Sequence, residues 1–229
     1  MSADEKLESL ITLSSRSSYG RLLTVAIKDG SVARKEVPAY VARALQRVVG
    51  NGFLEVWGPI GGGSENAKLF EKYRTLVTDE NLVKADPGRG RVLFRKTCQA
   101  CHKMYGEGGN IGPEITGANR TNLDYLLGNI LTPSADIQES YRMQLVLMDD
   151  GRMFSGIPAN ETKWQLTLRV ANQDDPVEIP KSKIEDRETA ETSMMPAGLL
   201  ENLSDVEVLD LMAYLKSLEQ VPMPPIVEQ

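Results

Sequence analysis

The sequence predicts a mainly α-helical protein interrupted by a β insertion, and three observations lead to that fold class. Apolar residues recur at helical spacing near both ends of the chain. Between them, alternating apolar and polar residues with turn signals fill about residues 140–190, which predicts short strands. No run of about 18 apolar residues occurs, so we expect no membrane-spanning segment. The formal net charge of −6 disfavours a nucleic-acid partner, because nucleic-acid binders are usually basic.

Residues 1–83 are expected to form a helical lead-in. Apolar residues at helical spacing mark helices around Leu7–Ile11, Leu22–Ile27 and Val41–Val48. Gly61–Gly63 indicates a flexible break before a further apolar segment, Leu69–Tyr73. Paired helices of this kind suit the last units of an α-solenoid, so we expect the lead-in to be HEAT-like.

Residues 84–229 are expected to form a second domain that begins and ends with a helix. Asp86-Pro87 is typical of an N-cap followed by proline at the first helical position, and the helix should run to Thr97. Near the other end, Ser204 and Glu207 have the spacing of a capping box. The helix that follows should bury one apolar face, formed by Val208, Leu211, Met212, Leu215 and Leu218.

A β insertion at about residues 140–190 is expected to interrupt this second domain. It follows a predicted helix, Asn122–Leu131, that ends before Pro133. Asp150-Gly151 is a hairpin signal between the first two strands. The insertion could cover part of a functional site, offer a docking surface, or be inert. The strand-like runs, which suggest a small antiparallel sheet or barrel, are Tyr141–Met148, Arg152–Ile157, Trp164–Val170 and Val177–Ile179.

The only two cysteines and the only histidine fall together as Cys98-Gln-Ala-Cys101-His102. This C-x-x-C-H pattern is typical of covalent haem c attachment. Two thiols three residues apart can share one face of a helical turn and reach the two vinyl groups on one porphyrin edge. The next residue can then direct its imidazole at the iron. We therefore predict one covalent haem c on Cys98 and Cys101, with His102 as an axial ligand.

The motif has three other interpretations. A redox dithiol also uses C-x-x-C, although it does not require the histidine. A structural zinc site needs about four ligands, and the cysteines and histidine of this chain number three. A disulfide across two intervening residues is strained and constrains little chain. The pattern favours haem c, and the redox dithiol is the main alternative.

The second axial ligand cannot be another histidine of the same chain, because there is none. A methionine, a lysine or an open position remains. The best candidate segment, Thr192–Gly198, contains Met194 and Met195, and we favour Met195 because Pro196 beside it stiffens the loop and keeps it out of helix. Both methionines could instead simply pack in a core. A His/Met pair would raise the reduction potential, which suits electron transfer.

These features together resemble the class I cytochrome c fold. Gly90, Phe94 and Tyr214 occupy the places where that family crosses its first and last helices. The segment Asn110–Gly117 (N-I-G-P-E-I-T-G) looks like the family's loop after the haem motif. By that resemblance, the carbonyl of Pro113 would accept the proton on the outer nitrogen of His102, which makes the imidazole a better donor to iron. The long separation of His102 from Met195 departs from the family and accommodates the β insertion.

The order of the motifs is also similar to the C-terminal haem-binding region of planctomycete- and verrucomicrobia-type membrane-bound dehydrogenases. The shared motifs are the helical lead-in, F-x-K-x-C-x-x-C-H, I-G-P-E-I-T-G, L-D-Y-L-L-x-N-I-L-x-P-S, the strand insert and S-M-M-P-x-G-L-L. The resemblance implies an excised C-terminal portion of a longer protein. That would explain the polar start of the sequence and the lack of an export signal in an extracytoplasmic, periplasmic protein. A free-standing cytochrome that has lost its leader is the alternative.

The function implied is a mono-haem electron-transfer module that is not catalytic by itself. It would take electrons from a dehydrogenase domain or partner protein and pass them to a downstream cytochrome or oxidase. The alternative is a haem c sensor or peroxidase-like enzyme whose sixth ligand is labile or absent. Because a peroxidase usually needs a distal base and this chain has no second histidine, electron transfer is favoured.

Overall fold

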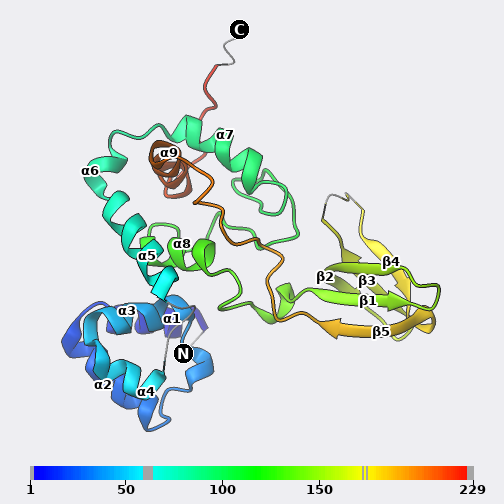
Figure 1. Ribbon diagram of the computed structural model, residues 1–229, viewed down its shortest axis with the longest axis horizontal. Coiled ribbons are helices and arrows are strands. Elements are labelled where there is room, and N and C mark those ends of the chain that lie inside the picture. Colours follow the sequence, from blue (N-terminus) through cyan, green and yellow to red (C-terminus); the bar gives the residue numbers. More distant parts are fainter. Residues whose placement is uncertain (1–2, 59–63, 172, 174, 226–229) are drawn as a thin grey trace.

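The computed structural model describes residues 3–58, 64–171, 173 and 175–225, and consists of a helical body from which a β-sheet projects (Figure 1). Within these residues, no helix is both long enough and apolar enough to span a membrane. The helices are α1 (Ala3–Leu13), α2 (Ser17–Lys28), α3 (Ala39–Val49), α4 (Asn51–Trp57), α5 (Ser64–Leu76), α6 (Asp79–Leu82), α7 (Pro87–Thr97), α8 (Leu123–Leu131) and α9 (Asp205–Leu215). The strands are β1 (Gln144–Met148), β2 (Met153–Glu161), β3 (Gln165–Arg169), β4 (Val177–Pro180) and β5 (Ile184–Thr189).

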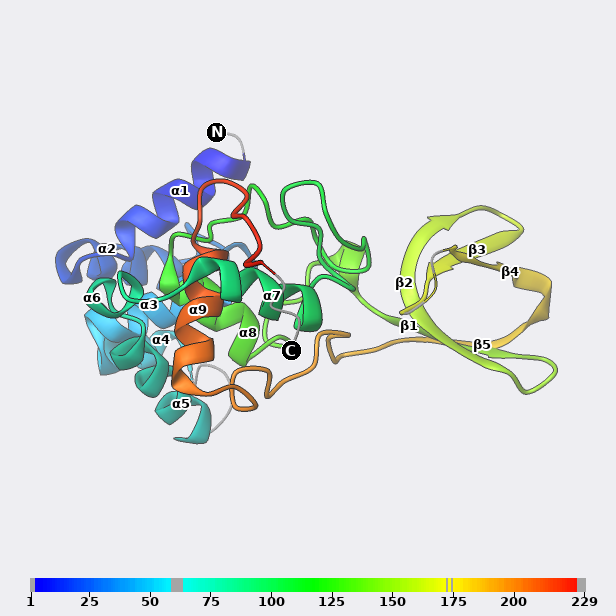
Figure 2. The ribbon, with the colours of Figure 1, turned by 90° about the horizontal axis from the view of Figure 1, so that it is seen from above.

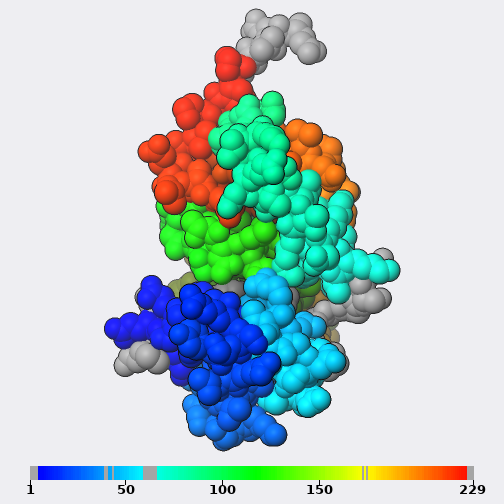
Figure 3. All heavy atoms as spheres, turned by 90° about the vertical axis from the view of Figure 1, so that its left-hand side faces the viewer, coloured from blue at the N-terminus to red at the C-terminus, as the bar shows by residue number. Residues whose placement is uncertain are grey.

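The first helices form a lobe of their own, which lies below the rest of the helical body in Figure 3. The helices predicted in this region are present, whereas the predicted glycine break, Gly61–Gly63, lies outside the described residues. HEAT-like character stays a prediction. Asp124 of α8 joins this lobe to the rest of the body, because it accepts hydrogen bonds from Arg47 of α3 and, at 2.7 Å, from Nε of Arg74 of α5. The buried core of the lobe consists of Leu10, Leu23, Val37, Val41, Ala42, Leu45, Phe53 and Trp57.

Helices α7 and α9 cross in close contact. A Cβ atom on Gly90 would collide with the carbonyl oxygen of Asp210, so glycine is what allows the two backbones to approach. The rings of Phe94 and Tyr214 meet edge to face, with centroids 5.4 Å apart. The sequence predicted this contact from the resemblance alone. Around it lies the main core of the helical body, which includes Phe70, Tyr73, Met104, Leu126, Leu127, Leu200, Val208, Leu211 and Met212.

The predicted caps of these two helices are confirmed. The side chain of Asp86 accepts the N–H of Gly88 at 2.8 Å at the start of α7. At the start of α9, the N–H of Ser204 donates to the Glu207 carboxylate at 2.8 Å, which completes the capping box. The prediction that Leu218 belongs to the buried face is wrong, because α9 ends at Leu215 and the Leu218 side chain is 84% exposed beyond it.

The projecting sheet has the antiparallel order β4-β3-β2-β1-β5. Its four predicted strands are present, and β5 is an additional strand that the sequence analysis missed. The chain enters and leaves the sheet at one point, where the N–H of Ala190 donates to the carbonyl of Met143 at 2.8 Å. The sheet curls so that its edge strands approach each other (Figure 2). Its buried core consists of Val146, Met148, Leu166, Leu168 and Ile179.

The Glu161 carboxylate joins the two edges of the curled sheet. It accepts Nη1 of Arg187, on β5, at 2.7 Å, and it lies 2.6 Å from Nζ of Lys181, which follows β4. These two hydrogen bonds lower the pKa of Glu161 to about 2. The carboxylate therefore fastens β2 to both edge strands in a partly closed barrel.

Candidate functional site

Cys98, Cys101 and His102 lie on one turn that continues from the end of α7. Cys98 is the C-cap of the helix, and its N–H donates to the carbonyl of Phe94 at 2.8 Å. The N–H groups of Cys101 and His102 both donate to the carbonyl of Cys98, at 3.1 and 2.9 Å. Both cysteines are free thiols, and all three side chains line one cavity. The local fold therefore presents two thiols and an imidazole to the same space.

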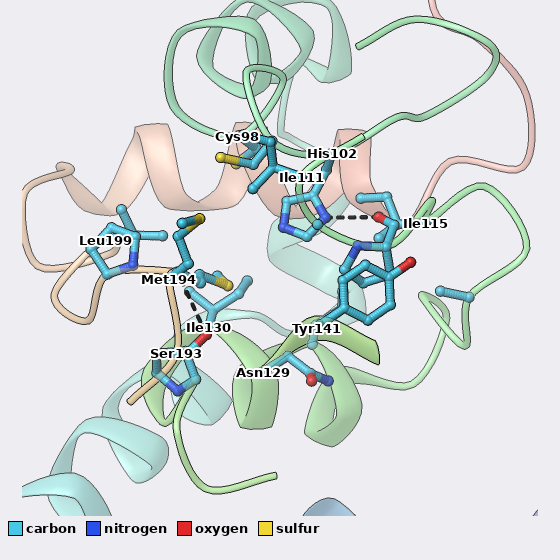
Figure 4. Close-up of a pocket in the computed structure, with 18 of the residues that line it drawn as sticks. Cys98, His102, Ile111, Ile115, Asn129, Ile130, Tyr141, Ser193, Met194 and Leu199 are labelled. Atoms are coloured by element: carbon cyan, nitrogen blue, oxygen red, sulfur yellow. Dashed lines mark hydrogen bonds between the residues drawn. The ribbon is translucent and has the colours of Figure 1, made fainter. Parts of the chain in front are cut away.

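The imidazole of His102 is held from behind by the Asn110–Gly117 loop. Its Nδ1 lies 2.9 Å from the carbonyl oxygen of Pro113, the atom that the sequence analysis proposed as its acceptor (Figure 4). The N–H of Gly112 donates to the carbonyl of Cys101 at 2.8 Å. A Cβ on Gly112 would lie 2.5 Å from Cε1 of His102, so only glycine lets the loop lie against the ring. Because Nδ1 is engaged, Nε2 is the nitrogen left to bind a metal.

The loop that carries Met194 and Met195 reaches the same cavity. Figure 4 shows Met194 across the cavity from His102, and both methionines are among its lining residues. The loop is pinned by two serines, since the N–H of Ser193 donates to Oγ of Ser134 at 3.0 Å and the N–H of Met195 donates to Oγ of Ser193 at 3.1 Å. Met195 also packs against the core cluster that contains Phe94. The structure thus brings the predicted thioether donors and the imidazole together.

The cavity between them is large and mainly apolar. Its empty space, counted together with the open solvent at its mouth, is about 1310 Å³. Two thiols, an imidazole and a thioether around an apolar cavity form the donor set of a c-type haem, so the residues present fit that group. The apolar lining includes Phe94, Ile111, Leu126, Ile130, Ile157 and Leu199.

The burial of the thiols does not favour a redox dithiol. Burial, together with the neighbouring Cys101, raises the pKa of Cys98 to about 12, and burial also raises the pKa of Cys101. Redox dithiols depend on a lowered thiol pKa. The structural-zinc interpretation also lacks support, because no three His, Cys, Asp or Glu side chains gather around a possible metal position in the described part of the chain.

Two groups of lining residues were missed by the sequence analysis. Arg120 is 6% exposed, and its guanidinium donates to the carbonyl of Ser217 at 2.9 Å and to the hydroxyl of Tyr105 at 3.0 Å. Tyr141 and Ile157 come from the β insertion and its approach. Arg120 follows the Asn110–Gly117 loop and gave no sequence signal of burial. Ile157 ends a predicted strand, and its alternation pattern does not distinguish it from residues of the sheet core.

A family model described as Cytochrome c matches residues 88–219, which is more than half of the chain. The matched range includes the C-x-x-C-H turn and the methionine loop and spans the β insertion between them. A search of curated proteins found no match.

Proposed function

The chain belongs to the cytochrome c family, whose members are haem c electron-transfer proteins, and we propose that it carries one haem c with His102 and Met195 as the axial ligands. The observation that carries the proposal is the shared cavity, in which two free thiols and His102 face a methionine loop. The chain has no other cysteine pair, so we propose a single haem.

Each residue has a distinct part in this proposal. Cys98 and Cys101 would form the two thioether links, and His102 would bind iron through Nε2. Pro113 would accept the proton of Nδ1, which fixes the tautomer and strengthens the imidazole as a donor. The bound haem would supply a one-electron ferric/ferrous couple. The apolar lining would keep water from that couple, and the preformed turn would hold its ligands with little rearrangement.

Met195 is preferred to Met194 for two reasons. Its neighbour Pro196 restricts the loop, and its side chain packs against the core cluster while still lining the cavity. Such packing limits the positions that the sulfur can take. The two residues therefore form a matched pair for mutagenesis.

We further propose an extracytoplasmic, periplasmic location and two redox partners. Cytochrome c domains are typically extracytoplasmic. The donor would be a dehydrogenase domain or protein, and the acceptor a downstream cytochrome or oxidase. This assignment is supported by the order of motifs that resembles the C-terminal region of large dehydrogenases. The boundary between the lead-in at residues 1–83 and the cytochrome domain at residues 84–229 belongs to the same proposal.

The first test is covalent attachment. The chain is expressed in a host that matures haem c, denatured, and extracted with acid acetone. We expect the pigment to stay with the protein and to give the pyridine haemochrome spectrum of a haem with two thioether links. A colourless protein would contradict the proposal, and Cys98→Ala and Cys101→Ala should each retain one link or lose the haem.

The second test is the identity of the sixth ligand. Met195→Ala should abolish the ferric charge-transfer band from methionine sulfur, lower the reduction potential and allow the ferrous protein to bind carbon monoxide. Met194→Ala is the matched control and should keep the band. The reverse result would assign the ligand to Met194, and carbon monoxide binding by the unmodified protein would indicate an open position instead.

A further inference from the structure

The β insertion forms part of the cavity wall. Ile157 of β2 is 1% exposed and lines the cavity, as does Tyr141 in the short helical turn before β1. Ile137 and Gln138, on the segment that leads to the sheet, continue this wall. The sheet is therefore in contact with the proposed haem site, although most of it projects away from the helical body (Figure 1).

One side chain bridges the sheet and the loop behind the imidazole. Arg169, at the end of β3, donates through Nη1 to the carbonyl of Asn110 and through Nη2 to the carbonyl of Pro158 at 3.5 Å. Its guanidinium also lies 5.9 Å from the ring centre of Tyr141. Asn110 begins the segment that continues to Pro113, the acceptor for His102. Arg169 thus contacts both the insertion and the loop that holds the imidazole.

One glycine lets two strands of the sheet, β2 and β3, lie close together. At Gly156, a Cβ would lie 2.6 Å from the carbonyl oxygen of Arg169. The missing side chain lets β2 and β3 draw together beside Ile157, which pairs with Arg169 in the strand register. The same pair of residues therefore supplies an apolar contact with the cavity and a polar contact with the loop.

We propose that Arg169 is a positioning residue that holds the β insertion against the haem pocket, so that Ile157 and Tyr141 keep water from one side of the haem. The proposal rests on the proposed haem c site. The physical consequence is a higher reduction potential, because the ferric form carries one more positive charge than the ferrous form and gains more from contact with water. The insertion would then tune the haem of this chain, and would be neither inert decoration nor solely a docking surface.

A charge effect and a positioning effect can be separated at Arg169. A cation near the iron would raise the potential on its own, whatever its shape. Positioning instead needs the planar fork, which can reach two carbonyl groups at once, whereas the single ammonium of lysine cannot reproduce that geometry. Arg169→Lys keeps the charge and removes the fork, and Arg169→Gln removes both.

The experiment measures the midpoint potential of four variants by spectroelectrochemistry. We expect Arg169→Gln and Arg169→Lys both to lower it, by up to about 59 mV, which is a tenfold change in the one-electron equilibrium constant. Ile157→Thr, which admits a hydroxyl at the wall, should lower it in the same direction. Arg152→Gln is the matched control, because Arg152 lies in the β1–β2 turn, where it pairs with Asp150, and its loss should leave the potential unchanged.

A second readout does not depend on the reduction potential. In Arg169→Gln with haem attached, hydrogen exchange at the amides of Gly112 and Ile157 should accelerate together, while the amides in the sheet core stay protected. Should Arg169→Gln fail to fold, Arg169→Lys and Ile157→Thr carry the same expectations.

Three results would overturn the inference. Wild-type potential in Arg169→Lys combined with a lowered potential in Arg169→Gln would show an effect of charge alone. Wild-type potential and exchange in both variants would show that Arg169 positions nothing. If the Ile157 amide stays protected while the Gly112 amide exchanges faster, the insertion stays in place without Arg169. Covalent haem is measured in every sample, so failure of the haem c proposal itself would be visible separately.

Discussion

The backbone N–H of Asp86 donates a 2.7 Å hydrogen bond to the carboxylate of Asp210, although the two residues are 124 positions apart. The same carboxylate accepts Nε of Arg89 at 2.7 Å, and its side chain is 2% exposed. Asp210 lies on α9 and the other two residues lie at the start of α7. One buried carboxylate therefore fixes how the first and last helices of the cytochrome domain cross.

Asp210→Ala should separate these helices. The substitution leaves the N–H of Asp86 without its acceptor, and we expect a loss of about 2 kcal/mol in the free energy of unfolding. Urea denaturation followed by circular dichroism measures it. Glu80→Ala removes an exposed pair with Lys84 and should change the free energy little. Equal losses in the two variants would show that Asp210 contributes no more than a surface charge.

Gly112→Ala should disturb the imidazole directly. The new Cβ would overlap the ring of His102 at 2.5 Å, so either the ring or the loop must move. We expect the bond from Nδ1 to Pro113 to lengthen and the reduction potential to rise, because a weaker imidazole donor stabilises the ferric form less. Gly117→Ala is the control, since a Cβ there would meet nothing within 4 Å. Potentiometry measures the reduction potential of both variants, and the NMR signal of the His102 ring N–H reports the hydrogen bond to Pro113.

The barrel-like closure of the sheet should depend on pH through Glu161. Its pKa is lowered from 4.5 to about 2 by hydrogen bonds from Arg187 and Lys181. A lowered folded-state pKa contributes stability that is complete above about pH 4.5 and is lost as the pH falls toward 2. The protection factors of the β5 amides should fall over that range in the wild type, and Glu161→Gln should show low protection already at pH 6. Glu185→Gln, at an exposed position on the same strand, should behave like the wild type.

Asp124→Asn should loosen the lead-in from the cytochrome domain. Burial pushes the pKa of Asp124 upward, but hydrogen bonds from Arg47 and Arg74 outweigh it and lower the pKa overall. The amide keeps the shape and loses the charge, and we expect a loss of about 2 kcal/mol in the free energy of unfolding. Lys72→Gln is the control, because it removes a solvent-exposed pair with Asp205. Faster hydrogen exchange at the α8 amides in Asp124→Asn, but not in Lys72→Gln, would show that the loss of stability arises at this contact.

Local signals predicted most of the helices and strands. The caps at Asp86 and Ser204 and the hairpin signal at Asp150-Gly151 act over a few residues, so the sequence contains the information directly. β5 was missed because four of its six residues are charged and its pairing with β1, not an apolar alternation, makes it a strand. Leu218 was misplaced because helical spacing continued past Leu215, where the helix ends.

The residues of the candidate site also divide into those with a local sequence signal and those without one. The cysteines, the histidine and the methionine loop are visible as motifs, and the contact of Pro113 with His102 follows from a resemblance. The wall supplied by Ile157 and the bridge made by Arg169 depend on contacts between distant segments. No local pattern encodes them, because a strand residue that faces a cavity has the same polarity as one that faces a sheet core.

The single hydrogen-bonded pair at which the chain enters and leaves the sheet has an architectural consequence. Because Met143 and Ala190 are adjacent, a tight turn could join them and remove the sheet without stretching the C-x-x-C-H turn or the methionine loop. The β unit is thus an insertion whose two ends lie side by side, next to the further contacts that Arg169 and Ile157 make with the helical body. Such a unit can be exchanged or diversified as long as the replacement keeps the contact that Arg169 makes with the carbonyl of Asn110.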